Sequence, residues 1–577
     1  MKRKFKFFSI LILALVLVLA ACGGGKKNED TGKTGAKSGK TEKSDAKGGT
    51  LNVGLSAPPE GNFQSIFAKS TGDSEVISYF NDGLVDYNDE LEMKPKILSW
   101  KDKGDGKTYE FKVKKGIKWQ DGNEFTINDW IFTLETLADK DYDGPRYTGV
   151  EDIKGAKEKH DGKADTVSGI KKIDDYTAEV TFDKKKVNNL LNLWTGAPIS
   201  EKVFKDIPVK DMGKSPEVRK NPIGIGPFKV KKIVDGESVE FEKFKDYWQG
   251  EPKIDKVNLR VIEQTSLTQA LESGEVDMAS VTAPIAKEVK ESGDEKLKVL
   301  ESPSTSYMIL GFVLNDYDKK TMKIGKERPK YQDVRLRKAM AHAINRDEWI
   351  KAFLYGYGEK TNSLIPSNHW VAADKDKLED YKYDTKEAEK LLDEAGYKDK
   401  DGDGFREDPQ GKPFEVNLKH YAGSNPTFEP RTAALKGYWE KVGLKTKVQM
   451  VEFGKFGTDL ENADKDMEVY FRSWSQGADP DPSGLYRSDA LWNESRYNNP
   501  EADKLLDDAL DFDKVGTDKE KRKDLYVKWQ QLMNKELPVI PMAELVDTTV
   551  VNDRVKNFEV SLKGTNPSYE WAVEDKK

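Results

Sequence analysis

The chain contains 577 residues, of which 34% are charged, and its 102 acidic residues slightly outnumber its 95 basic residues. The resulting net charge of −7 argues against a nucleic-acid partner, because proteins that bind nucleic acid carry basic surfaces. Cys22 is the only cysteine, which excludes a disulfide within the chain and a zinc site built from thiolates. The length is sufficient for two or three domains, each held by an apolar core.

The chain begins with the pattern of a bacterial export signal. Basic residues between positions 2 and 6 precede an apolar run over 7–21. A membrane-spanning helix needs about 20 apolar residues, so this shorter run predicts a signal peptide that is removed. The run ends in a Leu-Ala-Ala-Cys sequence at 19–22, which resembles the bacterial lipoprotein box. The resemblance implies that Cys22 receives a lipid such as palmitate; the alternative is an ordinary signal peptide with a chance cysteine.

The segment that follows is almost free of apolar residues. Residues 23–48 consist mainly of Gly, Lys, Ser, Thr, Asp and Glu. Such a segment buries too little apolar surface to offset its ordering entropy. We therefore expect residues 22–48, the lipidated cysteine included, to form a flexible tether, with the lipid as the only contact with the membrane.

Strands and helices are predicted in alternation along the rest of the chain. Alternating apolar and polar residues predict strands at 51–55, 108–113, 177–182, 227–234, 238–244, 257–262, 415–420 and 445–451. Helical spacing predicts helices at 77–85, 128–138, 265–273, 333–355, 385–395, 429–442, 500–512 and 518–535. Asn128 or Thr126 is expected to cap the second helix and Thr517 the last one. The alternation predicts an α/β class with α+β elements.

Four segments carry a family resemblance. The first is a strand, a turn with Trp119, an Asp-Gly turn and a capped helix over 111–135. The others are 224–230 with its continuation to 277, 333–346, and 497–503. In this order they are similar to the family 5 extracellular solute-binding proteins of ABC importers, the oligopeptide- and dipeptide-binding proteins. The resemblance runs from about residue 49 to the end of the chain.

The resemblance implies a two-lobed, periplasmic-binding-protein-like fold with a hinged cleft and an extra inserted domain. Because the chain crosses between the lobes more than once, they are expected to close on a ligand as rigid bodies. The implied division is lobe 1 from 49–76, 206–304 and 531–577, the inserted domain from 77–205, and lobe 2 from 305–530.

The implied function is the capture of extended oligopeptides and their delivery to the permease subunits and ATPases of an ABC importer. The protein is expected to act as a monomer on the outer face of the cell membrane of a Gram-positive bacterium. Within the family, a nickel chelate, an oligosaccharide, haem or glutathione is the alternative ligand. Enzyme function is not expected, because the four histidines form no H-E-x-x-H pattern and no G-x-S-x-G is present.

The candidate ligand contacts lie in one loop, at Trp474, Ser475, Gln476, Asp479 and Asp481. In the family, an aspartate in this loop pairs with the free amino group of the peptide. That aspartate lies three residues after the tryptophan in the enteric proteins, where Gly477 stands in this chain. Asp479 is therefore our first assignment and Asp481 our second. A turn built from Asp-Pro repeats is the alternative.

A second acidic loop resembles a calcium-binding loop. Asp399, Asp401 and Asp403 occupy the first, third and fifth positions, and a glycine follows at the sixth. Gln410 stands where an EF-hand has glutamate, so Asp408 is the predicted fourth carboxylate. No cofactor is expected to be required, and calcium would be structural. A solvated turn without metal is the alternative.

Overall fold

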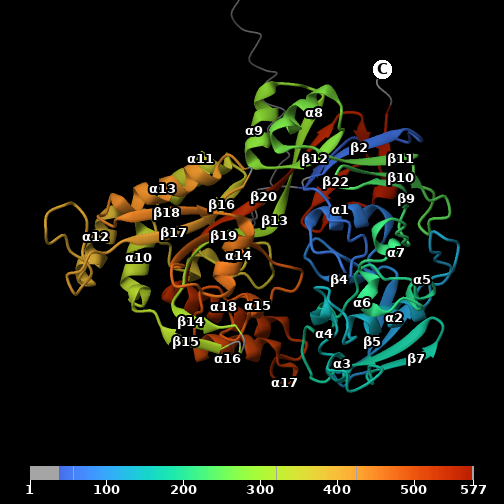
Figure 1. The fold of residues 1–577 in the computed structure, drawn as a ribbon, viewed down its shortest axis with the longest axis horizontal. Coiled ribbons are helices and arrows are strands. Elements are labelled where there is room, and N and C mark those ends of the chain that lie inside the picture. Colours follow the sequence, from blue (N-terminus) through green and yellow to red (C-terminus); the bar gives the residue numbers. More distant parts are fainter. Residues whose placement is uncertain (1–37, 56, 320, 322, 424, 575–577) are drawn as a thin grey trace, which may run out of the picture.

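The computed structural model describes residues 38–574 except 56, 320, 322 and 424. The predicted signal peptide, Cys22 and most of the predicted tether therefore lie outside the described residues. The molecule has two halves, one formed mainly by residues after 305 and the other by the earlier residues (Figure 1). Among the helices of the described part, none combines the length and apolar character needed to cross a bilayer.

One 11-stranded mixed sheet runs through both halves. Its two longest strands, β13 (Leu297–Phe312) and β20 (Val539–Asn552), are antiparallel neighbours at its middle. The strands in spatial order are β18 (Thr446–Val451), β17 (Val416–Tyr421), β19 (Val469–Ser475), β13, β20, β12 (Met278–Val281), β2 (Thr50–Leu55), β11 (Lys256–Val261), β10 (Ser238–Lys243) and β9 (Phe228–Val234), with β16 (Gly358–Lys360) beside β20.

The two long strands connect the cores of the two lobes. Residues 307–314 and 537–543 are buried in the lobe 2 core, whereas Leu300 and Val551 are buried in the lobe 1 core. The pairing of β13 with β20 shifts register between Pro303 and Tyr307. We call residues 301–306 and 544–549 the hinge segments, because they lie between the two cores.

Lobe 2 is held by a large apolar cluster that spans residues 307–543. The predicted boundary at 530 is too early, because helix α18 (Lys519–Glu536) and the start of β20 pack into this cluster. Its other helices include α10 (Val334–His342), α11 (Arg346–Leu354), α12 (Thr385–Glu394), α13 (Phe428–Glu440), α14 (Phe453–Glu461), α16 (Pro500–Leu510) and α17 (Phe512–Val515).

Two local predictions in lobe 2 were wrong. The helix predicted over 333–355 is two helices, because α10 ends at His342 and the Asn345 side chain caps a new helix, α11, by accepting from Glu348 N–H. The last long helix is capped by Asp518 and not by Thr517, since the Asp518 carboxylate accepts from the N–H groups of residues 520 and 521.

Lobe 1 combines the start of the chain, residues 228–300 and the C-terminal strands. Its helices are α1 (Thr71–Phe80), α8 (Leu267–Ser273) and α9 (Ala283–Ser292). Helix α1 is capped by Ser70 and ends at Phe80, so the helix predicted over 77–85 was misplaced. Its apolar face packs into the lobe 1 core, and the inserted domain therefore begins after Phe80 rather than at residue 77.

The inserted domain has its own sheet and core. Strands β5 (Leu98–Asp102), β6 (Thr108–Val113), β8 (Thr177–Thr181) and β7 (Ile170–Asp174) form the sheet. Helix α2 (Ile127–Leu137) covers it, and Thr126 caps this helix in a capping box with Asp129. The core continues through Met212 and Val218 to Ile225, so the predicted end at 205 is too early.

The predicted tether is not free over its last described residues. Strand β1 (Gly39–Lys40) pairs with β22 (Glu559–Ser561), which lies close to the C-terminus. The Thr41 side chain is buried and accepts from Phe558 N–H at 3.0 Å. Glu42 pairs with Lys556 at 2.8 Å. The prediction that the segment is flexible up to residue 48 is therefore wrong from residue 39 onward. Main-chain pairing supplies the stabilisation that burial of these polar side chains could not.

Candidate functional site

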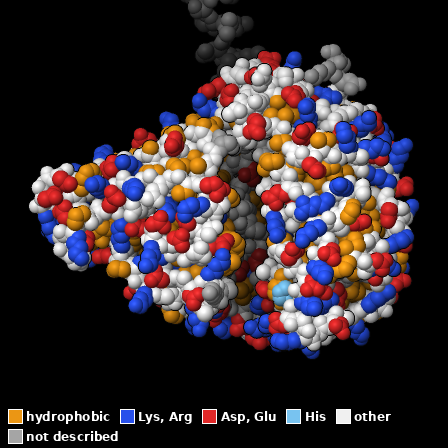
Figure 2. Space-filling view, viewed as in Figure 1, with side chains coloured by type: hydrophobic (Ala, Val, Ile, Leu, Met, Phe, Trp, Pro, Cys, Tyr) orange, Lys and Arg blue, Asp and Glu red, His pale blue; other side chains and the backbone are white. Residues whose placement is uncertain are grey.

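A groove runs between the two halves of the molecule (Figure 2). In both lobes, segments that follow the carboxyl ends of parallel strands line cavities between the two halves. These strands are β12 in lobe 1 and β17 and β19 in lobe 2. The carboxyl ends of parallel strands are the usual place for a ligand site in an open α/β sheet.

Strand β19 has one edge that is only partly paired. Along one edge it pairs with β13 from Val469 to Ser475. Along the other edge it pairs with β17 only at Val469 and Tyr470. Within the described part of the chain, no further strand covers this second edge at residues 471–475. The Phe471 carbonyl is engaged by His420 Nδ1 at 2.8 Å, and the main-chain groups beyond it are placed to pair with an extended chain that enters the groove.

Three of the predicted contact residues lie at the end of this strand. Trp474 is half-buried, with the Arg472 guanidinium 3.8 Å from its ring centroid and the Trp492 ring packed edge-on at 5.9 Å. Ser475 is exposed beside Thr305. Gln476 is buried, and its Nε2 donates to the Pro480 carbonyl at 2.5 Å. Its Oε1 has no partner among the described residues, so an acceptor remains available at the start of the loop.

Asp479 connects lobe 2 with the inserted domain. Its Oδ2 accepts from Asn188 Nδ2 at 2.7 Å, and Asn188 belongs to the inserted domain. Its Oδ1 accepts from Arg522 Nη2 on α18 at 3.1 Å. Both carboxylate oxygens are thus already engaged by the protein.

Asp481 has no cationic partner. Its Oδ1 accepts from the hydroxyls of Ser483 at 2.8 Å and Tyr526 at 3.1 Å. Among the described residues, no Lys or Arg lies within ion-pair distance of it. Burial, together with the charge of Asp479, raises the pKa of Asp481 to about 7. Of these two carboxylates, Asp481 is therefore the one without a cation within the described residues.

Both aspartates line a cavity of about 1480 Å³ between the inserted domain and lobe 2. The wall on the inserted-domain side includes Tyr87, Arg146 and Trp194, and the opposite wall includes the loop from Gly477 to Asp481. This volume exceeds the range of about 300–1,000 Å³ that is typical of pockets for small molecules. It is suited to a chain of several residues.

Main-chain contacts also join the inserted domain to lobe 2 beside this cavity. Val187 N–H donates to the Leu510 carbonyl at 3.1 Å, and Phe512 N–H donates to the Lys185 carbonyl at 3.2 Å. Lys185 also pairs with Asp513 at 3.2 Å. Sequence reasoning missed these contacts, because nothing in either segment indicates which distant segment it pairs with.

His369 is a further residue that the sequence did not indicate. Its side chain is buried near Asp479, and neither ring nitrogen has a partner within the described residues. Burial lowers the pKa of His369 to about 4, so the ring is neutral at physiological pH. Its ring therefore carries an unsatisfied donor and an unsatisfied acceptor near Asp479.

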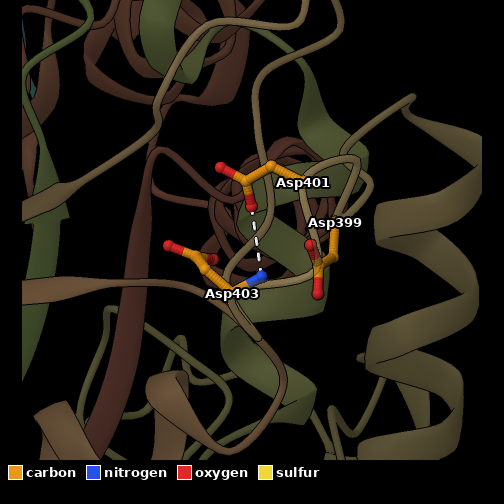
Figure 3. A group of neighbouring side chains, drawn as sticks. All are labelled: Asp399, Asp401 and Asp403. Atoms are coloured by element: carbon orange, nitrogen blue, oxygen red, sulfur yellow. Dashed lines mark hydrogen bonds between the residues drawn. The ribbon is translucent and has the colours of Figure 1, made fainter.

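The predicted calcium loop brings three carboxylates together on the surface (Figure 3). Asp399, Asp401 and Asp403 each offer an oxygen, and these oxygens lie within 4.8 Å of one another. This spacing fits one calcium ion with ligand bonds of about 2.3–2.6 Å. Asp408 is not part of the group, because its Oδ1 closes a turn by accepting from the N–H groups of Gln410 and Lys412.

Comparison with known proteins places these features in context. The model of the bacterial extracellular solute-binding proteins, family 5 Middle, matches residues 96–496. The oligopeptide-binding protein AppA of Bacillus subtilis is 28% identical over 521 residues, which cover 88% of each chain. OppA of Lactococcus lactis subsp. lactis is 30% identical over 82% of this chain and 80% of its own. The structure of lactococcal OppA with an endogenous peptide in the closed conformation has a TM-score of 0.78, with 26% identity, and covers 91% of this chain and all of its own.

Proposed function

The chain belongs to the family 5 bacterial extracellular solute-binding proteins, and we propose that it captures extended oligopeptides between its lobes for an ABC importer. The family is one of binding proteins, so the chain is not an enzyme. The mixed α/β, two-lobed fold is that of its structural relatives. Peptide capture itself is our proposal, and it is argued from the edge of β19 and the cavity beside it.

The observation that carries the proposal is the open edge of β19 beside the large cavity. On the edge of β19 that faces away from β13, residues 471–475 have no strand partner among the described residues. An extended peptide that adds to this edge gains hydrogen bonds that do not depend on its side chains. The roomy cavity beyond Gly477 then accommodates varied side chains with bridging water.

Asp481 is the proposed partner for a positive group of the peptide, in particular its amino terminus. A desolvated ammonium needs a partner, and Asp481 is the carboxylate in this loop that has no cation beside it within the part of the chain that the structure describes. The test is calorimetric binding of one peptide, free and N-acetylated, to wild type and to Asp481→Asn and Asp479→Asn. We expect N-acetylation of the peptide to weaken its binding to wild type, and Asp481→Asn to weaken binding of the free peptide. Any loss of affinity in Asp479→Asn is expected to come from the weakened contact between lobe 2 and the inserted domain. If wild type binds both peptide forms equally, the protein does not recognise the amino terminus of the peptide.

The lipid anchor and the importer complete the proposal. Cys22 would carry the lipid on the outer face of the cell membrane, and the permease with its ATPases would receive the closed, loaded form. The pairing of β1 with β22 supports an attachment through lobe 1, because it holds the start of the described chain against that lobe.

Ligand class is tested most simply by thermal shift of the purified mature protein. The panel contains mixed oligopeptides, a nickel–histidine chelate, an oligosaccharide, haem and glutathione, each at equal concentration. The proposal predicts that only peptides raise the melting temperature strongly. A shift by one of the other ligands, with none by peptides, would assign the chain a different solute.

A further inference from the structure

Two short segments from different parts of the chain pair like strands beside the main cavity. Residues 184–187 belong to the inserted domain, and residues 510–513 belong to lobe 2. Lys186 and Asp511 form an antiparallel bridge. Main-chain hydrogen bonds of 3.1 and 3.2 Å join the two segments on either side of this bridge. We call the two segments together the clasp.

The two segments of the clasp carry opposite charge. Residues 184–186 are three consecutive lysines, whereas residues 507–513 include four aspartates. Lys185 Nζ lies 3.2 Å from a carboxylate oxygen of Asp513, and both side chains are exposed. Like charges within each segment repel one another, and this repulsion is offset when the oppositely charged segments meet. Charge therefore favours the same pairing that the main-chain hydrogen bonds complete.

Two further contacts join the same surfaces. The Phe512 ring packs against Gly106 of the inserted domain, where a Cβ would lie 3.0 Å from the ring. Glu92 of the inserted domain forms an ion pair with Lys519 at the start of α18. Three separate stretches of the inserted domain thus contact lobe 2 here, and the clasp is part of a contact between surfaces rather than an isolated ion pair.

The clasp is separate from the hinge. The hinge segments join lobe 2 covalently to lobe 1, and the chain enters and leaves the inserted domain from lobe 1. Helix α17 lies close to α4 (Asn189–Asn192) and away from the middle of the large sheet (Figure 1). Among the described residues, both segments of the clasp line the cavity of about 1480 Å³ and the hinge segments do not. The clasp is therefore a second, non-covalent junction, and it has to break when the inserted domain and lobe 2 move apart.

We propose that the clasp is an electrostatic closure that determines how long a peptide stays in the cavity and that salt weakens. The inference rests on the proposed function, because a peptide is the ligand whose release the clasp would delay. An exposed ion pair contributes little by itself. Reversing one of its charges has a larger effect, because attraction is replaced by repulsion from the like charges of the facing segment.

Hydrogen exchange of the ligand-free mature protein tests the clasp without any peptide. The amides of residues 187 and 512 donate across the clasp, so their exchange rates report how often it opens. Exchange is followed by mass spectrometry at about 0.1 M and about 1 M sodium chloride, where charges are screened over about 10 Å and 3 Å. Exchange in strand β6, within the inserted domain, is the internal reference.

The variants are Lys185→Glu, Asp513→Lys and the charge swap that combines both. Lys185 is the lysine to change, because Lys186 is paired with Asp152 of its own domain at 2.7 Å. The matched control swaps the charges of an exposed ion pair within the inserted domain, Lys157→Glu with Asp161→Lys.

At the lower salt concentration, each single reversal should speed exchange at the two amides by about threefold or more. The charge swap should restore the wild-type rate, and the control should keep it. Higher salt should speed exchange of wild type at the clasp relative to β6. Wild-type exchange that does not respond to salt overturns the proposal without any variant. A charge swap that exchanges as fast as the single variants also overturns it, since the loss would then be local damage.

Peptide release tests the consequence of the clasp. The dissociation rate of a labelled oligopeptide is measured on the same proteins by chasing it with unlabelled peptide. Each single reversal should release the peptide about threefold faster or more, whereas the charge swap and the control should behave as wild type. Equal release by all variants overturns the proposal even if exchange at the clasp changes. Absence of peptide binding by wild type refutes the proposed function, and hydrogen exchange then still decides whether charge closes the clasp.

Discussion

The contact between Asn188 and Asp479 gives a direct test of lobe closure. Asn188 lies in the inserted domain and is 2% exposed, and its amide donates to the Asp479 carboxylate at 2.7 Å. The two residues are 291 positions apart in the chain, so the bond exists only when lobe 2 lies against the inserted domain. Asn188→Ala removes this bond and leaves the Arg522 partner of Asp479 in place.

The magnitude follows from the charge on the acceptor. Hydrogen bonds to charged groups contribute about 1.5–3 kcal/mol. Because Asp479 keeps its bond to Arg522, we use the lower end of this energy range. About 1.4 kcal/mol corresponds to a tenfold change in an equilibrium constant. Apparent affinity scales with the population of the binding-competent state. We therefore expect Asn188→Ala to weaken peptide binding about tenfold.

The assay is calorimetric titration of one peptide into wild type, Asn188→Ala and Asn189→Ala. Asn189 is the matched control, because its buried amide donates to the Lys184 carbonyl within the same domain and does not reach lobe 2. The reasoning is refuted if Asn188→Ala binds as tightly as wild type. It is also refuted if both variants weaken binding equally, since the loss would then reflect damage within the inserted domain.

Four further predictions follow from individual residues. Cys22→Ser should leave the precursor unprocessed or release the protein from membranes; a processed, membrane-bound variant in cell fractionation would contradict lipidation. Calcium at 100 times its dissociation constant should add about 2.7 kcal/mol to the free energy of unfolding, and Asp401→Ala should remove the resulting rise in melting temperature. Thr41→Ala leaves Phe558 N–H without its side-chain acceptor and should cost about 1–3 kcal/mol by denaturant titration; no change would mean that the paired N-terminal segment is not stabilising. Because the pKa of Asp481 is raised from 3.8 to about 7 in the folded state, its protonation stabilises the fold below pH 3.8 and this contribution is lost as the pH rises through 7. The free energy of unfolding of wild type relative to Asp481→Asn should therefore fall over that interval, and a constant difference would refute the assignment.

Local patterns predicted several strands within the sheets but not the long strands of the hinge. The strands predicted at 108–113, 238–244 and 257–262 alternate apolar and polar residues, and all three form, the last two at 238–243 and 256–261. The long strands β13 and β20 were missed, because each contains a proline within its run and both mix apolar stretches with polar residues. Only their pairing with each other, more than two hundred residues apart, identifies them as strands.

The candidate site was predictable in place but not in detail. Family resemblance located the loop that follows Trp474, and both aspartates do line a cavity. Which of them is free for a ligand depends on Asn188 and Arg522, and no local pattern links these residues to the loop.

The central claim is that a peptide pairs with the open edge of β19, and hydrogen exchange measures this directly. Amide exchange over residues 471–476 is followed by mass spectrometry with no ligand, with a bound oligopeptide and with a non-peptide solute. The account predicts slower exchange in this segment with the peptide and no change with the other solute. Tight peptide binding that leaves exchange at residues 471–476 unchanged would contradict it.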